Sequence, residues 1–211
     1  QAGSFMGPHV AELFREEGAD VLIVRDMPAT ETEVDRMIAE LGTIDILVAN
    51  FAGDAPRIGV TETRDDTFAA MYETMVAPLH RTVRAVLPQM IDRRSGKIVV
   101  MGSATGVRGV ENTSAYSTAR GAQLAYVRTV GAEMGPHNVQ VNAIAQTLVA
   151  NDTYFPPSVR NSLAIQQRIR ATPGRRMAEP REAAALALFL ASNESDFFFG
   201  QCIPFSGGWI S

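Results

Sequence analysis

Short runs of branched apolar residues alternate along this chain with longer segments in which apolar residues recur at helical spacing. This alternation predicts a parallel sheet covered by helices on both faces. Thr30, followed by Glu33, predicts a capping box, and the longest helix is expected to bend near Pro78. The predicted strands are 20–25, 45–50, 97–102, 139–145 and 201–205, and the predicted helices are 7–18, 30–41, 65–93, 114–134, 158–170 and 180–191.

A chain of 211 residues suits one α/β domain, so we expect residues 1–211 to form a single doubly wound unit. In such a sheet a first strand normally precedes the first helix and lies in the middle of the sheet. The first predicted helix begins at Gly7, so we expect that first strand to be absent from this sequence.

Composition excludes several classes of function. The net charge is -4 and no block of basic residues occurs, which argues against nucleic acid as a partner. No apolar run approaches the roughly 18 residues of a membrane span. Cys202 is the single cysteine, so no internal disulfide can form, and we expect a cytoplasmic protein. The three histidines are far apart, so no metal site is expected.

Three polar residues form the candidate catalytic set. Ser103 ends a predicted strand, and Tyr116 lies near the start of the next helix with Arg120 four residues later. Because residues at i and i+4 share a helix face, the Arg120 guanidinium can lie beside the Tyr116 phenol. A fixed positive charge favours the phenolate, so we expect Tyr116 to act as a general base on a substrate hydroxyl. The Ser103 hydroxyl could hold the same oxygen.

Several stretches resemble the short-chain dehydrogenase/reductase superfamily, and the resemblance extends over essentially the whole chain. They are LVANFAG at 47–53, GKIVVMGS at 96–103, YSTAR at 116–120, VNAI at 141–144 and SGG at 206–208. The resemblance implies a Rossmann-like fold. In that superfamily a lysine normally stands four residues after the tyrosine and also contacts the nicotinamide ribose of NAD(P).

The chain departs from the superfamily pattern where the nucleotide would bind. Arg120 replaces the lysine, and Lys97, the only lysine of the chain, precedes its strand and cannot substitute for it. Gln1 and Phe5 stand where the first two glycines of the glycine-rich turn belong, and glycines there let the backbone approach a pyrophosphate. The segment around Met75 lacks the asparagine that many relatives carry.

A Ser, Tyr, Arg set with a blocked glycine turn is similar to the halohydrin dehalogenases. The resemblance implies that Ser103, Tyr116 and Arg120 convert vicinal haloalcohols to epoxides without a cofactor, and that halide, azide, cyanide or nitrite opens epoxides in reverse. It also implies a homotetramer paired through the helices at 65–93 and 114–134. The implied halide and substrate pocket is lined by Phe5, Phe51, Gln146, Thr147, Leu148, Val149, Tyr154 and Phe155.

Two other functions remain open at this stage. The first is an NAD(P)-dependent short-chain oxidoreductase, because Asp26 closes a predicted strand where a dinucleotide fold places its ribose-binding acid. The second is a non-catalytic small-molecule sensor on the same scaffold, which would have no reason to keep the Ser, Tyr and Arg residues in register.

Overall fold

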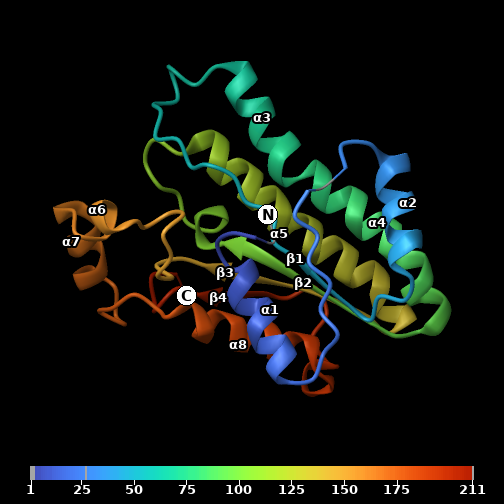
Figure 1. Cartoon of the computed structure of the whole chain (residues 1–211). Helices are drawn as coiled ribbons and strands as arrows, with labels where there is room; N and C mark the ends of the chain where they lie inside the picture. Colours follow the sequence, from blue (N-terminus) through green and yellow to red (C-terminus); the bar gives the residue numbers. More distant parts are fainter. Residues whose placement is uncertain (1–2, 27, 211) are drawn as a thin grey trace.

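A four-stranded parallel sheet forms the centre of the molecule (Figure 1). A computed structural model describes residues 3–26 and 28–210, so Gln1 lies outside the described residues. The strands follow one another in chain order across the sheet: β1 (Ile46–Ala49), β2 (Gly96–Ser103), β3 (Val139–Gln146) and β4 (Cys202–Phe205). Every residue of β2 and β3 is buried, as expected for strands covered on both faces.

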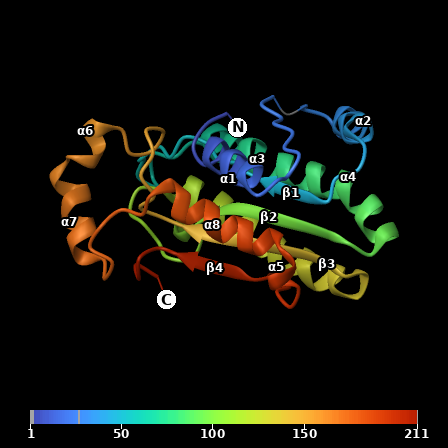
Figure 2. The same ribbon diagram turned by 60° about the horizontal axis from the view of Figure 1, so that its bottom comes forward.

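Helices cover both faces of the sheet (Figures 1 and 2). Because side chains alternate along a strand, Val99 and Met101 of β2 pack with α1 (Gly7–Glu16) and α8 (Pro180–Ala191). Ile98 and Val100 point the other way, into the core beneath α4 (Ala77–Arg93) and α5 (Ser114–Met134). The predicted Rossmann-like α/β class is confirmed.

The long predicted helix is two helices, α3 (Asp65–Met75) and α4, separated at Val76. Pro78 follows the break and has no N–H to continue the ladder of hydrogen bonds, so the expected bend is confirmed. The capping box of α2 (Glu31–Leu41) is also confirmed, since the backbone N–H of Glu33 donates to Thr30 Oγ1 at 3.4 Å and that of Thr30 donates to Glu33 Oε2 at 3.2 Å.

Two predicted elements are wrong. Residues 20–25 do not form a strand. An apolar run becomes a strand only beside a partner, and among the described residues none pairs with this one. The helix predicted at 158–170 is divided into α6 (Pro157–Arg160) and α7 (Leu163–Ala171), because Ser162 caps α7 by accepting from the Ile165 N–H at 3.4 Å. Three short 3-10 helices complete the described chain: Ala104–Gly106, Gly135–His137 and Asn193–Ser195.

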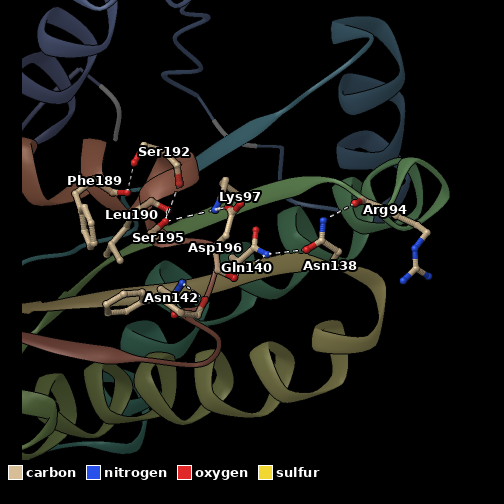
Figure 3. Close-up of polar contacts among 11 residues, drawn as sticks. Arg94, Lys97, Asn138, Gln140, Asn142, Phe189, Leu190, Ser192, Ser195 and Asp196 are labelled. Atoms are coloured by element: carbon tan, nitrogen blue, oxygen red, sulfur yellow. Dashed lines mark hydrogen bonds and ion pairs between the residues drawn. The ribbon is translucent and has the colours of Figure 1, made fainter.

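A polar network occupies the amino-terminal edge of the sheet (Figure 3). Lys97, near the start of β2, is buried and pairs through Nζ with Asp196 Oδ1 at 2.5 Å. Its ammonium also donates to Ser195 Oγ at 3.4 Å. Ser103 ends the same strand at the opposite edge, so Lys97 is remote from the candidate site, as the sequence predicted.

In the described part of the chain, no helix is both long and apolar enough to cross a membrane. Within the same residues, no three histidine, cysteine or acidic side chains are grouped so that they could hold a metal ion.

Candidate functional site

The carboxyl ends of the strands carry the candidate catalytic residues. Ser103 is the last residue of β2, and its side chain accepts a hydrogen bond from the Thr105 N–H at 3.3 Å. Its hydroxyl also shares a 2.9 Å hydrogen bond with the Thr105 hydroxyl, a partner that sequence analysis did not single out. Tyr116 lies in the first turn of α5 with Arg120 one turn later, and all three candidate residues are buried.

Arg120 is held rigidly beside the Tyr116 ring. Its guanidinium carbon lies 5.8 Å from the ring centroid, so the expected pairing across one helix turn is present. Nη1 donates to the carbonyl of Phe51 at 2.8 Å, and Nη2 donates to the carbonyl of Met101 at 3.0 Å. Both terminal nitrogens are therefore bound by main chain, and the positive charge stays fixed at the phenol.

Gln123 is a buried residue of this site that sequence analysis missed. Its Nε2 donates to the Phe51 carbonyl at 2.9 Å and to the Met75 carbonyl at 2.8 Å. Met75 ends α3 at the helix break, where the backbone ladder is interrupted. Gln123 therefore links the break between α3 and α4 to the Phe51 carbonyl, which also accepts a hydrogen bond from Arg120. The signal in the sequence was a polar residue three positions after Arg120 on the buried face of α5.

Tyr154 lies next to Tyr116. Its hydroxyl donates to the Gly53 carbonyl at 2.7 Å, and its ring meets the Phe5 ring edge-on at a centroid distance of 5.1 Å. Burial raises the pKa of the Tyr154 phenol, and the neighbouring Tyr116 raises that pKa further. Tyr154 therefore stays protonated as a hydrogen-bond donor.

The loop predicted to bind halide follows β3. Gln146 is buried beside Ser103 on the neighbouring strand, and neither its Oε1 nor its Nε2 has a hydrogen-bond partner. Buried amides without partners are rare in folded proteins, so this one is a candidate ligand group. The backbone N–H of Thr147 is already engaged, since it donates to the Phe205 carbonyl at 3.1 Å.

Four other predicted pocket residues take different places. Phe51 contributes its carbonyl to Arg120, while its ring lies in the core between the sheet and α4 and α5. Phe155 and Leu148 pack in a separate apolar cluster with Ile165 and Ile169. Val149 joins the core beneath α1 and α8. These four side chains are apolar, and each packs with other apolar residues.

Comparison with known proteins identifies a wide family. The family described as "Enoyl-(Acyl carrier protein) reductase" matches residues 10–210. Among curated relatives, a 3-oxoacyl-(acyl-carrier-protein) reductase FabG of Chlamydia muridarum is 31% identical, with 83% of this chain and 69% of that protein covered. A cyclohexanol dehydrogenase of Rhodococcus sp. is 28% identical, with 99% of this chain and 80% of that protein covered.

Solved structures point in two functional directions. A protein described as "Dehalogenation enzyme" superposes with a TM-score of 0.88 at 27% identity, covering 99% of this chain and 95% of its own. An NADPH-bound short-chain oxidoreductase of Pseudomonas aeruginosa with an atypical catalytic centre superposes with a TM-score of 0.87 at 26% identity, covering 99% of this chain and 94% of its own. A halohydrin dehalogenase with a TM-score of 0.89 is 23% identical, which supports the fold alone.

The fold, the Ser, Tyr and Arg positions and the family match over nearly the whole described chain agree with one another. The chain belongs to the short-chain dehydrogenase/reductase superfamily.

Proposed function

We propose that this protein is a halohydrin dehalogenase, converting vicinal haloalcohols to epoxides, halide and a proton without a nucleotide. The observation that carries the proposal is the state of Arg120. Its two terminal nitrogens donate to the carbonyls of Phe51 and Met101, so the guanidinium is held against main chain where the superfamily's lysine would contact a nicotinamide ribose.

The residues around Tyr116 do not fit a dinucleotide. Phe5 has a φ of 56°, a conformation that suits the glycine usually found in this turn, yet it carries a benzyl group into that space. Its ring packs edge-on against Tyr154, so an aromatic pair stands at the turn where glycines of the superfamily let the backbone approach a pyrophosphate. The proposed reaction therefore uses no nucleotide.

In the proposed reaction, the Tyr116 oxygen accepts the proton of the substrate hydroxyl, with the Arg120 guanidinium fixed over the Tyr116 ring. Ser103 donates a hydrogen bond to the developing alkoxide. The alkoxide attacks the neighbouring carbon from behind, forming the C–O bond as the C–halogen bond breaks, and the halide leaves with the bonding electron pair. Tyr116 then releases its proton to solvent. No electrons are transferred to an acceptor.

The Gln146 amide is our candidate for receiving the leaving halide. Its Nε2 is a buried donor without a partner, on the strand next to Ser103. An N–H donor in an apolar setting can hold a weakly hydrated anion. The structural likeness to a dehalogenation enzyme at 27% identity supports the same reaction.

The second candidate is an NAD(P)-dependent oxidoreductase, favoured by the FabG relative and the NADPH-bound neighbour. One experiment separates the two. We expect the purified protein to release chloride from 1,3-dichloro-2-propanol with no nucleotide present, and to leave NADPH fluorescence unchanged on titration. Saturable NADPH binding with no chloride release would support the oxidoreductase instead.

A further inference from the structure

Three arginines and a tryptophan form a second cluster beside the candidate site. The guanidinium carbons of Arg108 and Arg168 lie 4.8 Å and 4.4 Å from the centroid of the Trp209 ring. The charge of Arg57 also acts on Arg168. We call Arg57, Arg108, Arg168 and Trp209 the arginine cluster. Stacking on an indole holds a guanidinium in place while leaving its N–H edge available to a ligand.

The charged members of the arginine cluster are all positive. In the part of the chain that the structure describes, none of the three arginines forms an ion pair with a carboxylate. Burial lowers the pKa of the Arg168 guanidinium, and the like charges of Arg57 and Arg108 lower it further. Its Nε is buried without a partner. The repulsion between these positive charges and the unpartnered Nε of Arg168 both favour the binding of an anion.

The cluster connects directly to the candidate active site. Arg168 Nη2 donates to Thr147 Oγ1 at 2.9 Å, and Thr147 follows the unpartnered Gln146. Arg108 lies five residues after Ser103, and its Nη1 donates to the Trp209 carbonyl at 2.8 Å. Figure 1 shows α7, which carries Arg168, beyond the carboxyl ends of the strands. The cluster therefore stands at the same edge of the sheet as Ser103 and Tyr116.

We propose that the arginine cluster binds an oxyanion on the substrate, so that the preferred haloalcohols and epoxides carry an acidic substituent, of which a carboxylate is the smallest. This proposal rests on the proposed dehalogenase function. A guanidinium presents paired N–H donors that match the two oxygens of a carboxylate. Arg168, which is held at Thr147, would bind the acid group at one end of the substrate while the substrate hydroxyl contacts Tyr116.

The test compares 4-chloro-3-hydroxybutanoate with its methyl ester, which has the same reactive carbons and no charge. Chloride release should give a kcat/KM about 10-fold or more higher for the acid, because charge-assisted hydrogen bonds of this strength change affinity by at least that factor. We expect Arg168→Gln to bring the acid-to-ester ratio close to one, chiefly through the KM of the acid. Arg170→Gln, an exposed change on the same helix, should keep the wild-type ratio.

A binding measurement separates this proposal from the proposed reaction. Calorimetry with 3-hydroxybutanoate, which lacks the halogen, should show binding that Arg168→Gln weakens about 10-fold and that rising salt weakens further. Equal turnover of acid and ester, with no binding of 3-hydroxybutanoate, would overturn the oxyanion site and leave the dehalogenase intact. Arginine-dependent binding without chloride release from any substrate would overturn the dehalogenase and keep the oxyanion site.

Discussion

Two glutamines on β3 have the same chemistry and opposite surroundings. Gln140 and Gln146 lie six residues apart, so their side chains leave the same face of the strand, and they are 2% and 4% exposed. Gln140 Nε2 donates to Asn138 Oδ1 at 3.2 Å and to the Asp196 carbonyl at 3.4 Å (Figure 3). Neither polar atom of Gln146 has a partner.

The charged groups repeat this difference between the two edges of the sheet. At the amino-terminal edge the buried ammonium of Lys97 has a carboxylate partner in Asp196. At the carboxyl edge, Arg108 and Arg168 stack on Trp209 with no carboxylate partner among the described residues. One edge satisfies its polar groups internally and contributes to stability. The carboxyl edge has donors without hydrogen-bond partners, which is typical of a ligand-binding site.

The largest effect is expected from Tyr116→Phe, which removes the proposed general base from the carboxyl edge of the sheet. Chloride release from 1,3-dichloro-2-propanol should fall by about 10² to 10⁴-fold, the range for loss of a positioned base. Tyr126→Phe on the same helix is the control. Burial and Glu133 raise the pKa of Tyr126 to about 12, and its hydroxyl lies 3.3 Å from His80 Nδ1, away from the candidate set. Equal activity of the two variants would contradict the role of Tyr116.

The next effect is on stability, from Arg120→Lys. An ammonium cannot reach both carbonyls that the guanidinium fork binds, so either Phe51 or Met101 loses its donor. The free energy of unfolding in urea should fall by about 1–3 kcal/mol. Arg128→Lys, an exposed change on α5, should leave it unaltered. If Arg120→Lys bound NADPH saturably, Arg120 alone would be the residue that excludes the nucleotide. Phe5 and Tyr154 would then not prevent nucleotide binding.

The smallest effect compares the two glutamines directly. Gln146→Met replaces an unpartnered amide by an apolar chain of similar size, so the free energy of unfolding should rise by about 1 kcal/mol while chloride release falls. Gln140→Met removes a satisfied donor and should lower the free energy of unfolding by about 1 kcal/mol with chloride release retained. Urea unfolding of both variants measures the contrast. A shift of the same sign in both would mean that the two edges do not differ.

The local elements followed from sequence pattern. The limits predicted for α5 and α8 agree with the structure, because Gly135 and Pro136 follow the end of α5 and Pro180 is the first residue of α8. The pairing of Tyr116 with Arg120 was also predictable, since a separation of four residues on a helix brings two side chains together whatever surrounds them. The position of Ser103 followed from the end of a buried strand.

Other features depended on contacts between distant segments. Residues 20–25 have an apolar pattern, but no strand of the described chain pairs with them. Phe51 was predicted as a pocket-lining residue, and the structure shows its carbonyl accepting a hydrogen bond from Arg120. Gln123 reaches Met75 only because the break between α3 and α4 lies against α5.

The sequence by itself determined the fold class, the limits of α5 and α8 and the Tyr116 and Arg120 pair, because these depend on boundary residues and on spacing within one element. Tertiary structure decided which of two identical glutamines would have partners and which two arginines would meet at Trp209. The physical reason is that hydrogen-bond satisfaction and charge balance depend on what neighbouring segments bring to a position, and side-chain type along the chain does not contain that information.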